Sequence, residues 1–150
     1  MNYNDLMKSK GYIYLNNLSE PEENSLCILI DRCKINNKSE DIDLGERFTE
    51  AYYPIEVDDG LPAIQLEFKS YVSYSVINES FTVMDDYEVF QGEIFKIFTK
   101  SRYLDFIKAG TIAEDIFPED KFVHYQVPCL NHIIDIISYE EPKITEKKRG

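Results

Sequence analysis

The chain has 150 residues, about the length of one domain, and its 28 Asp and Glu against 16 Lys and Arg give a formal net charge of −12. A field of this sign repels the phosphates of nucleic acids and the anionic surface of membranes, so we expect neither as a partner. The 43% of hydrophobic residues is too high for a disordered chain and predicts a folded domain.

The cysteines and the lack of a targeting pattern predict a cytoplasmic protein. Cys27, Cys33 and Cys129 cannot all pair within one chain, and reduced thiols fit them best. No stretch reaches the roughly 20 apolar residues that span a bilayer. The first residues also lack the basic and apolar pattern of a secretory signal.

The first half of the chain predicts short strands and one acidic segment. Residues 11–15 (GYIYL) and 25–35 (SLCILIDRCKI) have strand composition, and the SEPEEN sequence between them predicts a turn. Residues 40–59 contain eight acidic residues and one base, Arg47. This composition predicts an irregular segment that leads into a short strand near 51–57.

The middle of the chain predicts half-buried strands. Polar and apolar residues alternate over 63–77, and similar runs follow at 81–84, 87–90 and 93–98. This alternation is typical of an antiparallel sheet with one covered face.

A helix is predicted after Ser101, because a serine hydroxyl can cap the first turn. Leu104 and Ile107 contribute to an apolar stripe at helical spacing. Gly110 is expected in the left-handed position just after the helix, and a second short helical turn is expected at 111–116.

The stretch KFVHYQVPCLNHIIDIIS at 121–138 predicts a β-hairpin with Leu130 and Asn131 as its loop. The predicted pairs are Cys129 with His132, Val127 with Ile134, Tyr125 with Ile136 and Val123 with Ser138. The opposite face then carries His124, Gln126, Ile133, Asp135 and Ile137. The two histidines point to opposite sides of the sheet and cannot share a metal ion, so we predict no metal site.

Together these elements predict an α+β fold, with a mostly antiparallel sheet of about six to eight strands and one or two short helices packed on one face or end. We expect a single globular domain over 1–150 with frayed tails at about 1–9 and 142–150. The polar C-terminal sequence EPKITEKKRG is one reason for expecting a frayed end.

The sequence contains no phosphate-loop, nucleophile-elbow or zinc-protease motif, so we predict no cofactor and no catalytic residue. The acidic charge favours a non-enzymatic binding or inhibitor protein with a basic protein partner. An immunity-type protein that neutralises a basic toxin or nuclease is a concrete example. The predicted partner-binding residues are Asp41, Asp43, Glu46, Glu50, Tyr52, Tyr53, Asp58 and Asp59.

Other functions fit the same sequence. One is a small enzyme that uses an unmarked carboxylate pair or Cys129 with His132, where the imidazole would activate the thiol. Another is a ligand-binding domain with a tyrosine-lined pocket. A third is a structural or oligomerising module that pairs exposed strand edges. The oligomeric state is left open by the sequence.

Overall fold

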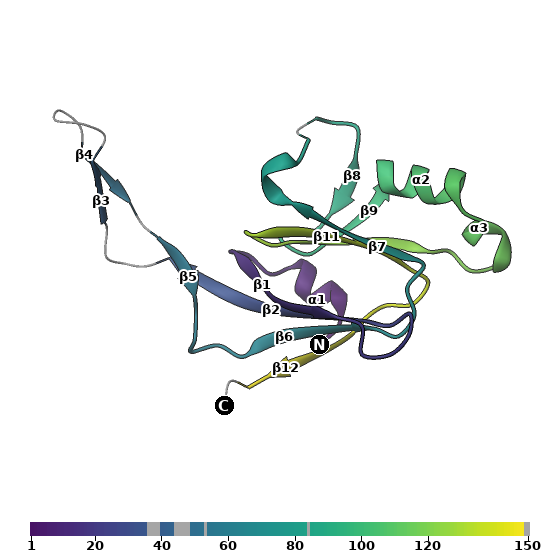
Figure 1. Cartoon of the computed structure of the whole chain (residues 1–150), viewed down its shortest axis with the longest axis horizontal. Helices are drawn as coiled ribbons and strands as arrows, with labels where there is room; N and C mark the ends of the chain where they lie inside the picture. The colour runs from purple at the N-terminus through teal and green to yellow at the C-terminus, as the bar shows by residue number, and fades with distance from the viewer. Residues whose placement is uncertain (36–39, 44–48, 53, 84, 149–150) are drawn as a thin grey trace.

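The computed structural model describes residues 1–35, 40–43, 49–52, 54–83 and 85–148. Its strands form two five-stranded antiparallel sheets and a two-stranded ribbon, and the two larger sheets lie face to face (Figure 1). The α+β class is confirmed. The described residues form 12 strands, more than the predicted six to eight, and three of them lie in the acidic segment.

The first sheet has the strand order β1–β2–β6–β12, and β5 pairs with the far end of β2. Its strands are β1 (Ile13–Ser19), β2 (Leu26–Ile35), β5 (Ile55–Val57), β6 (Ala63–Phe68) and β12 (Lys143–Lys147). β2 is buried in its apolar first half and exposed at its polar end, as its composition predicts.

The second sheet has the strand order β7–β11–β10–β9–β8. Its strands are β7 (Ser73–Asn78), β8 (Val89–Gln91), β9 (Lys96–Lys100), β10 (Val123–Pro128) and β11 (His132–Ser138). β10 and β11 form the predicted hairpin in the predicted register, with Val127 opposite Ile134 and Tyr125 opposite Ile136.

The ribbon consists of β3 (Glu40–Asp43) and β4 (Thr49–Tyr52), which pair antiparallel. Figure 1 shows the ribbon extending away from the two larger sheets. Part of the acidic segment that we expected to be irregular therefore has regular strand pairing.

The hydrophobic core lies between the inner faces of the two larger sheets. Ile28 and Leu66 of the first sheet belong to the same buried cluster as Tyr125 and Ile134 of the second. Full burial of an isoleucine or leucine side chain contributes about 1.5–3 kcal/mol, so this cluster is the main source of stability.

Both ends of the described chain pack onto the sheets, which differs from the expectation of frayed tails. Helix α1 (Tyr3–Met7) buries Tyr3 and Leu6 in the core. At the other end, β12 pairs with β6, and Ile144 is buried. Each polar end thus contains apolar side chains whose burial anchors it.

Helix α2 (Arg102–Gly110) begins after Ser101, the predicted N-cap, whose Oγ accepts a hydrogen bond from the Leu104 N–H at 3.0 Å. The helix lies on the outer face of the second sheet, the face turned away from the first sheet (Figure 1). There Leu104 and Ile107 pack against Ile137 of β11.

The remaining helical elements differ in part from the predictions. Gly110 is the last residue of α2, and Thr111 leaves the helix in an extended conformation, so Gly110 does not have the predicted left-handed role. α3 (Ala113–Ile116) confirms the second helical turn, while the 3₁₀ helix η1 (Glu79–Phe81) begins the connection where we expected a strand near 81–84. Every helix in the described residues is too short or too polar for a transmembrane span.

Candidate functional site

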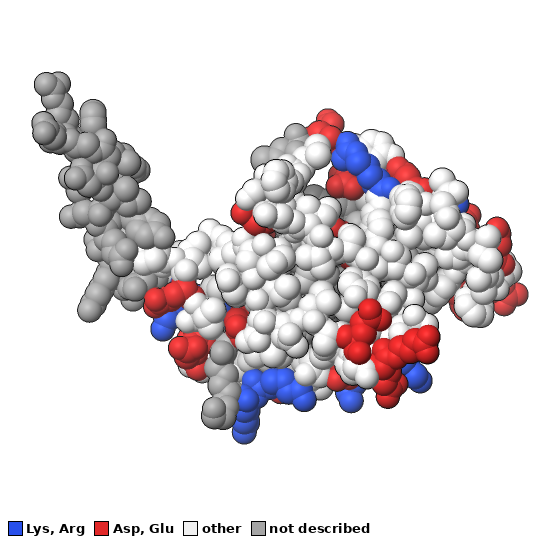
Figure 2. Space-filling view, in the orientation of Figure 1, with Lys and Arg blue, Asp and Glu red and all other residues white. Residues whose placement is uncertain are grey.

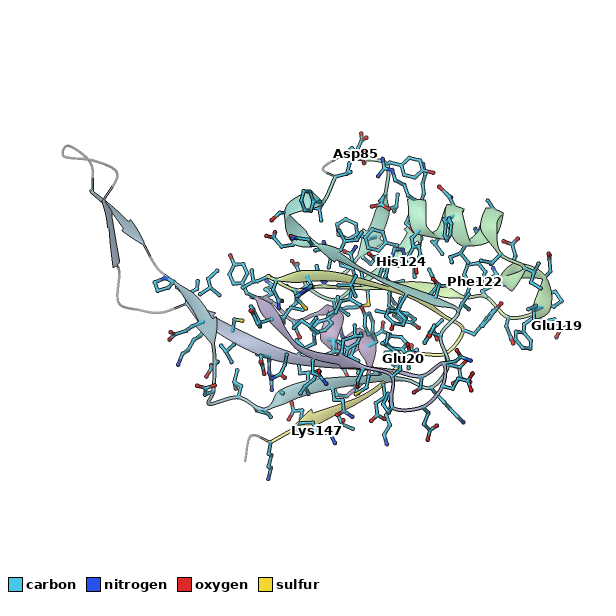
Figure 3. All side chains as sticks on the ribbon, in the orientation of Figure 1. Glu20, Asp85, Glu119, Phe122, His124 and Lys147 are labelled. Atoms are coloured by element: carbon cyan, nitrogen blue, oxygen red, sulfur yellow. The ribbon has the colours of Figure 1, made fainter. Side chains whose placement is uncertain are left out.

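A pocket of about 580 Å³ lies on the outer face of the second sheet, and we call it the outer pocket. Its volume is in the range of about 300–1,000 Å³ that is typical of small-molecule sites. Its lining residues are Ser75, Ile77, Phe81, Thr82, Val83, Asp85, Glu88, Phe90, Lys96, Phe98, Arg102, Tyr103, His124, Gln126, Pro128, Ile133 and Asp135. Figure 3 shows His124 between the second sheet and α2, with Asp85 above it on the connection from β7 to β8.

Strand pairing arranges the floor of the outer pocket in rows across the sheet. The row beneath α2 consists of Phe98, His124, Ile137 and Ser73, and the first two of these line the pocket. The central row consists of Lys96, Gln126, Asp135 and Ser75. The third row consists of Pro128, Ile133 and Ile77. The central row is therefore wholly polar, although it crosses the middle of a sheet.

A chain of hydrogen bonds fixes the carboxylate of Asp135 in this row. Its Oδ1 lies 2.6 Å from His124 Nε2 and accepts a second hydrogen bond from Gln126 Nε2 at 3.0 Å. His124 Nδ1 lies 2.7 Å from Ser101 Oγ, the oxygen that caps α2 at the Leu104 N–H. Asp135, His124 and Ser101 are all buried, with 6%, 2% and 0% of their surface exposed.

The hydrogen bonds of His124 link the Asp135 carboxylate to the cap of α2. The Asp135 carboxylate only accepts, so Nε2 of His124 carries a proton and donates. His124 Nδ1 shares a hydrogen bond with the Ser101 hydroxyl, whose oxygen also accepts from the Leu104 N–H at the start of α2. The orientation of Asp135 is therefore linked to the first turn of α2.

Aromatic rings form much of the pocket wall. The Phe98 ring is stacked on the imidazole of His124 at 4.6 Å, and Tyr103 meets the same imidazole edge-on at 5.4 Å. Lys96 Nζ lies 4.2 Å from the centre of the Phe90 ring, a cation–π contact. Burial lowers the pKa of Lys96.

Charged contacts at the edge of the outer pocket connect the β7–β8 connection to α2. Arg102 forms an ion pair with Asp85 at 2.5 Å, and its backbone N–H donates to Glu88 at 3.0 Å. The hydrogen bond from Arg102 lowers the pKa of Asp85. Tyr87 also donates to Asp105 of α2. These contacts hold the connection over the sheet and so create the pocket.

The predicted partner-binding residues lie elsewhere. Asp41, Asp43, Glu50 and Tyr52 belong to the ribbon, while Glu46 and Tyr53 lie outside the described residues. Asp58 and Asp59 lie in the turn after β5, where Asp58 Oδ1 accepts from the Gly60 N–H. None of the described members of this set lines the outer pocket. On the face shown in Figure 2, acidic side chains occur at several places and alternate with Lys and Arg.

Cys129 and His132 are paired through their backbones, since the Cys129 N–H donates to the His132 carbonyl at 2.8 Å. Burial raises the pKa of the Cys129 thiol to about 12, so it is protonated at neutral pH. His132 Nδ1 is buried without a hydrogen-bond partner among the described residues. The pair therefore lacks the activated thiolate that nucleophilic catalysis requires.

No group of three or more His, Cys, Asp or Glu in the described part of the chain has an arrangement suited to a metal ion. Comparison with known protein families, curated proteins and solved structures gives no match to this chain. Function must therefore be inferred from the chemistry of the outer pocket. A sequence signal for it exists: Asp135 is the one charged residue in the HIIDIIS strand, and it faces Gln126.

Proposed function

We propose that the protein is a non-enzymatic binding protein that captures a basic partner protein, as an inhibitor of the immunity type does, and that the outer pocket is its binding site. The observation that carries this proposal is the buried Asp135 carboxylate. Three buried or half-buried side chains orient it, and it lines a pocket with aromatic walls. A carboxylate held in this way is suited to a positively charged group.

The same chain contains the residue types of a serine hydrolase, but their arrangement favours binding. Ser101 has 0% of its surface exposed, and its oxygen is occupied by the N-terminus of α2. A nucleophile must reach the substrate, and this hydroxyl cannot. Ser101 and His124 therefore serve to position Asp135.

The charge of the pocket and of the whole chain both favour a basic partner. The lining contains three acids, Asp85, Glu88 and Asp135, and two bases, Lys96 and Arg102. One of the two bases, Arg102, is already paired with Asp85. The net charge of −12 adds a long-range attraction that accelerates encounter with a cationic surface.

Titration with a dye-labelled peptide of Arg, Lys and Gly, followed by fluorescence anisotropy, tests this proposal. Asp135→Asn should weaken binding by about tenfold, because it removes the buried carboxylate at the floor of the pocket. The control is Glu23→Gln, which removes the same charge from an exposed turn and should change affinity by less than about twofold.

A combined Asp41→Asn, Asp43→Asn and Glu50→Gln variant compares the pocket with the ribbon. Equal effects of Asp135→Asn and Glu23→Gln would mean that net charge alone attracts the peptide, and would reject the pocket as the site. A loss confined to the ribbon variant would transfer the site to the ribbon.

A further inference from the structure

Two hydrogen-bond acceptors at the floor of the outer pocket are open. Both hydrogen bonds to Asp135 go to Oδ1, and Oδ2 has no hydrogen-bond partner among the described residues, although the side chain is more than nine-tenths buried. Gln126 must direct its NH₂ group to the carboxylate, because a carboxylate cannot donate. Its Oε1 is therefore the free end of the amide, and it too has no partner within the described chain.

The residues that carry these two acceptors are neighbours. Gln126 and Asp135 are directly opposite each other on β10 and β11, and such pairs have Cβ atoms about 4.5–5.5 Å apart. Neither oxygen is among the buried atoms that lack a hydrogen-bond partner in the described chain, so both are accessible in the pocket and can accept from a ligand. The natural occupant is a cation with at least two N–H donors that can reach both oxygens at once.

The shape of the donor decides between the two basic side chains. A guanidinium presents N–H groups in a rigid planar fork, whereas an ammonium is a compact point charge. Its plane also stacks on aromatic rings, and Phe90, Phe98 and Tyr103 line the pocket. Lys96 shows that this wall accepts a cation, since its Nζ lies against the Phe90 ring.

We infer that the outer pocket binds the guanidinium of an arginine side chain of the partner protein, with N–H groups donating to Asp135 Oδ2 and Gln126 Oε1. This inference rests on the proposed function and narrows the partner to basic proteins with an exposed arginine. The positive charge of Lys96 repels a guanidinium at this site, because Lys96 lies next to Gln126 in the central row.

NMR titration of the native protein with single-residue probes tests the inference without any variant. The probes are N-acetyl-arginine methylamide and the equivalent lysine and citrulline compounds. The arginine probe should bind at least about fivefold more tightly than the lysine probe, and citrulline, which keeps the shape without the charge, should cause no shift. Chemical shifts should change at Gln126 and Asp135 and not at Ile28 in the core.

Three variants test which residues determine the preference for arginine over lysine. Gln126→Met removes the second acceptor and should reduce the arginine-to-lysine affinity ratio to about one, while Asp135→Asn should weaken both probes. Lys96→Met should tighten arginine binding by about threefold, because a like charge is removed. Chemical shifts outside the pocket verify that each variant is folded.

Equal affinity of the arginine and lysine probes for the native protein, or an unchanged ratio in Gln126→Met, would overturn the inference. Neither result affects the proposed function, which fails only if capture of the basic peptide does not depend on Asp135. Agmatine, a free guanidino compound, separates the sources of the group. If agmatine bound tenfold more tightly than N-acetyl-arginine methylamide, the pocket would be a site for a small molecule. The inference that it binds an arginine side chain of a partner protein would then be wrong.

Discussion

The two faces of the β10–β11 hairpin differ sharply although they share one backbone. The inner face carries Tyr125, Val127, Ile134 and Ile136, all buried against the first sheet. The outer face carries His124, Gln126 and Asp135, which form a hydrogen-bonded chain at the floor of the outer pocket. The inner face provides stability. The outer face carries the Asp135 carboxylate at a buried position of the sheet that an apolar side chain could also occupy.

This difference indicates where function lies. Burial of a charge is costly unless it is well hydrogen-bonded, and replacement by apolar residues is often neutral or stabilising. A carboxylate that is retained in a buried row, with one oxygen left open, is therefore better explained by a ligand than by folding. Variants on each face separate the two roles.

The largest expected effect is on the inner face. Ile134→Ala should lower the free energy of unfolding by about 2–5 kcal/mol, because it leaves a cavity in the core. Ile133→Ala is the matched control on the outer face, where the side chain is only half-buried, and should cost about 1 kcal/mol. Urea denaturation measures both, and equal losses would contradict the division between the faces.

The next largest effect on the free energy of unfolding is expected for the hydrogen bonds of Ser101, which support the outer face. Ser101→Ala removes the cap of α2 and the partner of His124 Nδ1, and should cost about 1–2 kcal/mol. Asn78→Ala removes the exposed cap of η1 and should cost less than about 1 kcal/mol. In Ser101→Ala, binding of the arginine probe should weaken as well. Unchanged binding would show that the position of Asp135 does not depend on this chain.

A smaller effect is expected at high pH. Burial raises the pKa of Tyr125 from 10.0 to about 12, so the unfolded chain loses this proton first. The stability linked to Tyr125 is thus complete below pH 10 and is lost as the pH rises toward 12. Between pH 8 and pH 11 the free energy of unfolding should fall less in Tyr125→Phe than in the native protein, as measured by urea denaturation. Parallel decreases in the two proteins would contradict the assignment.

The smallest effect on stability is expected for Asp135→Asn. The asparagine oxygen can accept the same two hydrogen bonds. These bonds are weaker with a neutral acceptor, but the cost of burying a charged carboxylate is removed as well. We expect a change of less than about 1 kcal/mol in the free energy of unfolding, together with weaker cation binding. A loss as large as that of Ile134→Ala would make Asp135 a structural residue.

Local patterns predicted much of the fold. The short loop at Leu130 and Asn131 and the alternation around it were sufficient for the register of β10 and β11, and Ser101 was identified as a cap. The same alternation placed His124, Gln126 and Asp135 on one face. These features depend on neighbours in the sequence, which is why they were predictable.

The outer pocket was not predictable, because it depends on contacts between separate segments. Ser101 reaches His124 only when α2 folds over the second sheet, and Arg102 must pair with Asp85 to hold the connection in place. The periodicity of polar and apolar residues in a sequence does not predict contacts between distant segments. The acidic residues of 40–59 drew attention by their number, whereas Asp135 is significant because it is isolated among isoleucines.

Tyr3 of α1 connects the N-terminal helix to the opposite side of the binding face. Its hydroxyl lies 2.9 Å from the Lys96 carbonyl and 3.0 Å from the Gln126 carbonyl, directly behind two residues of the central row. The strands that carry these residues are thereby tied together from the rear. Proteolytic trimming that removed Tyr3 would loosen this tie, and so would alter recognition without touching any atom that faces the ligand.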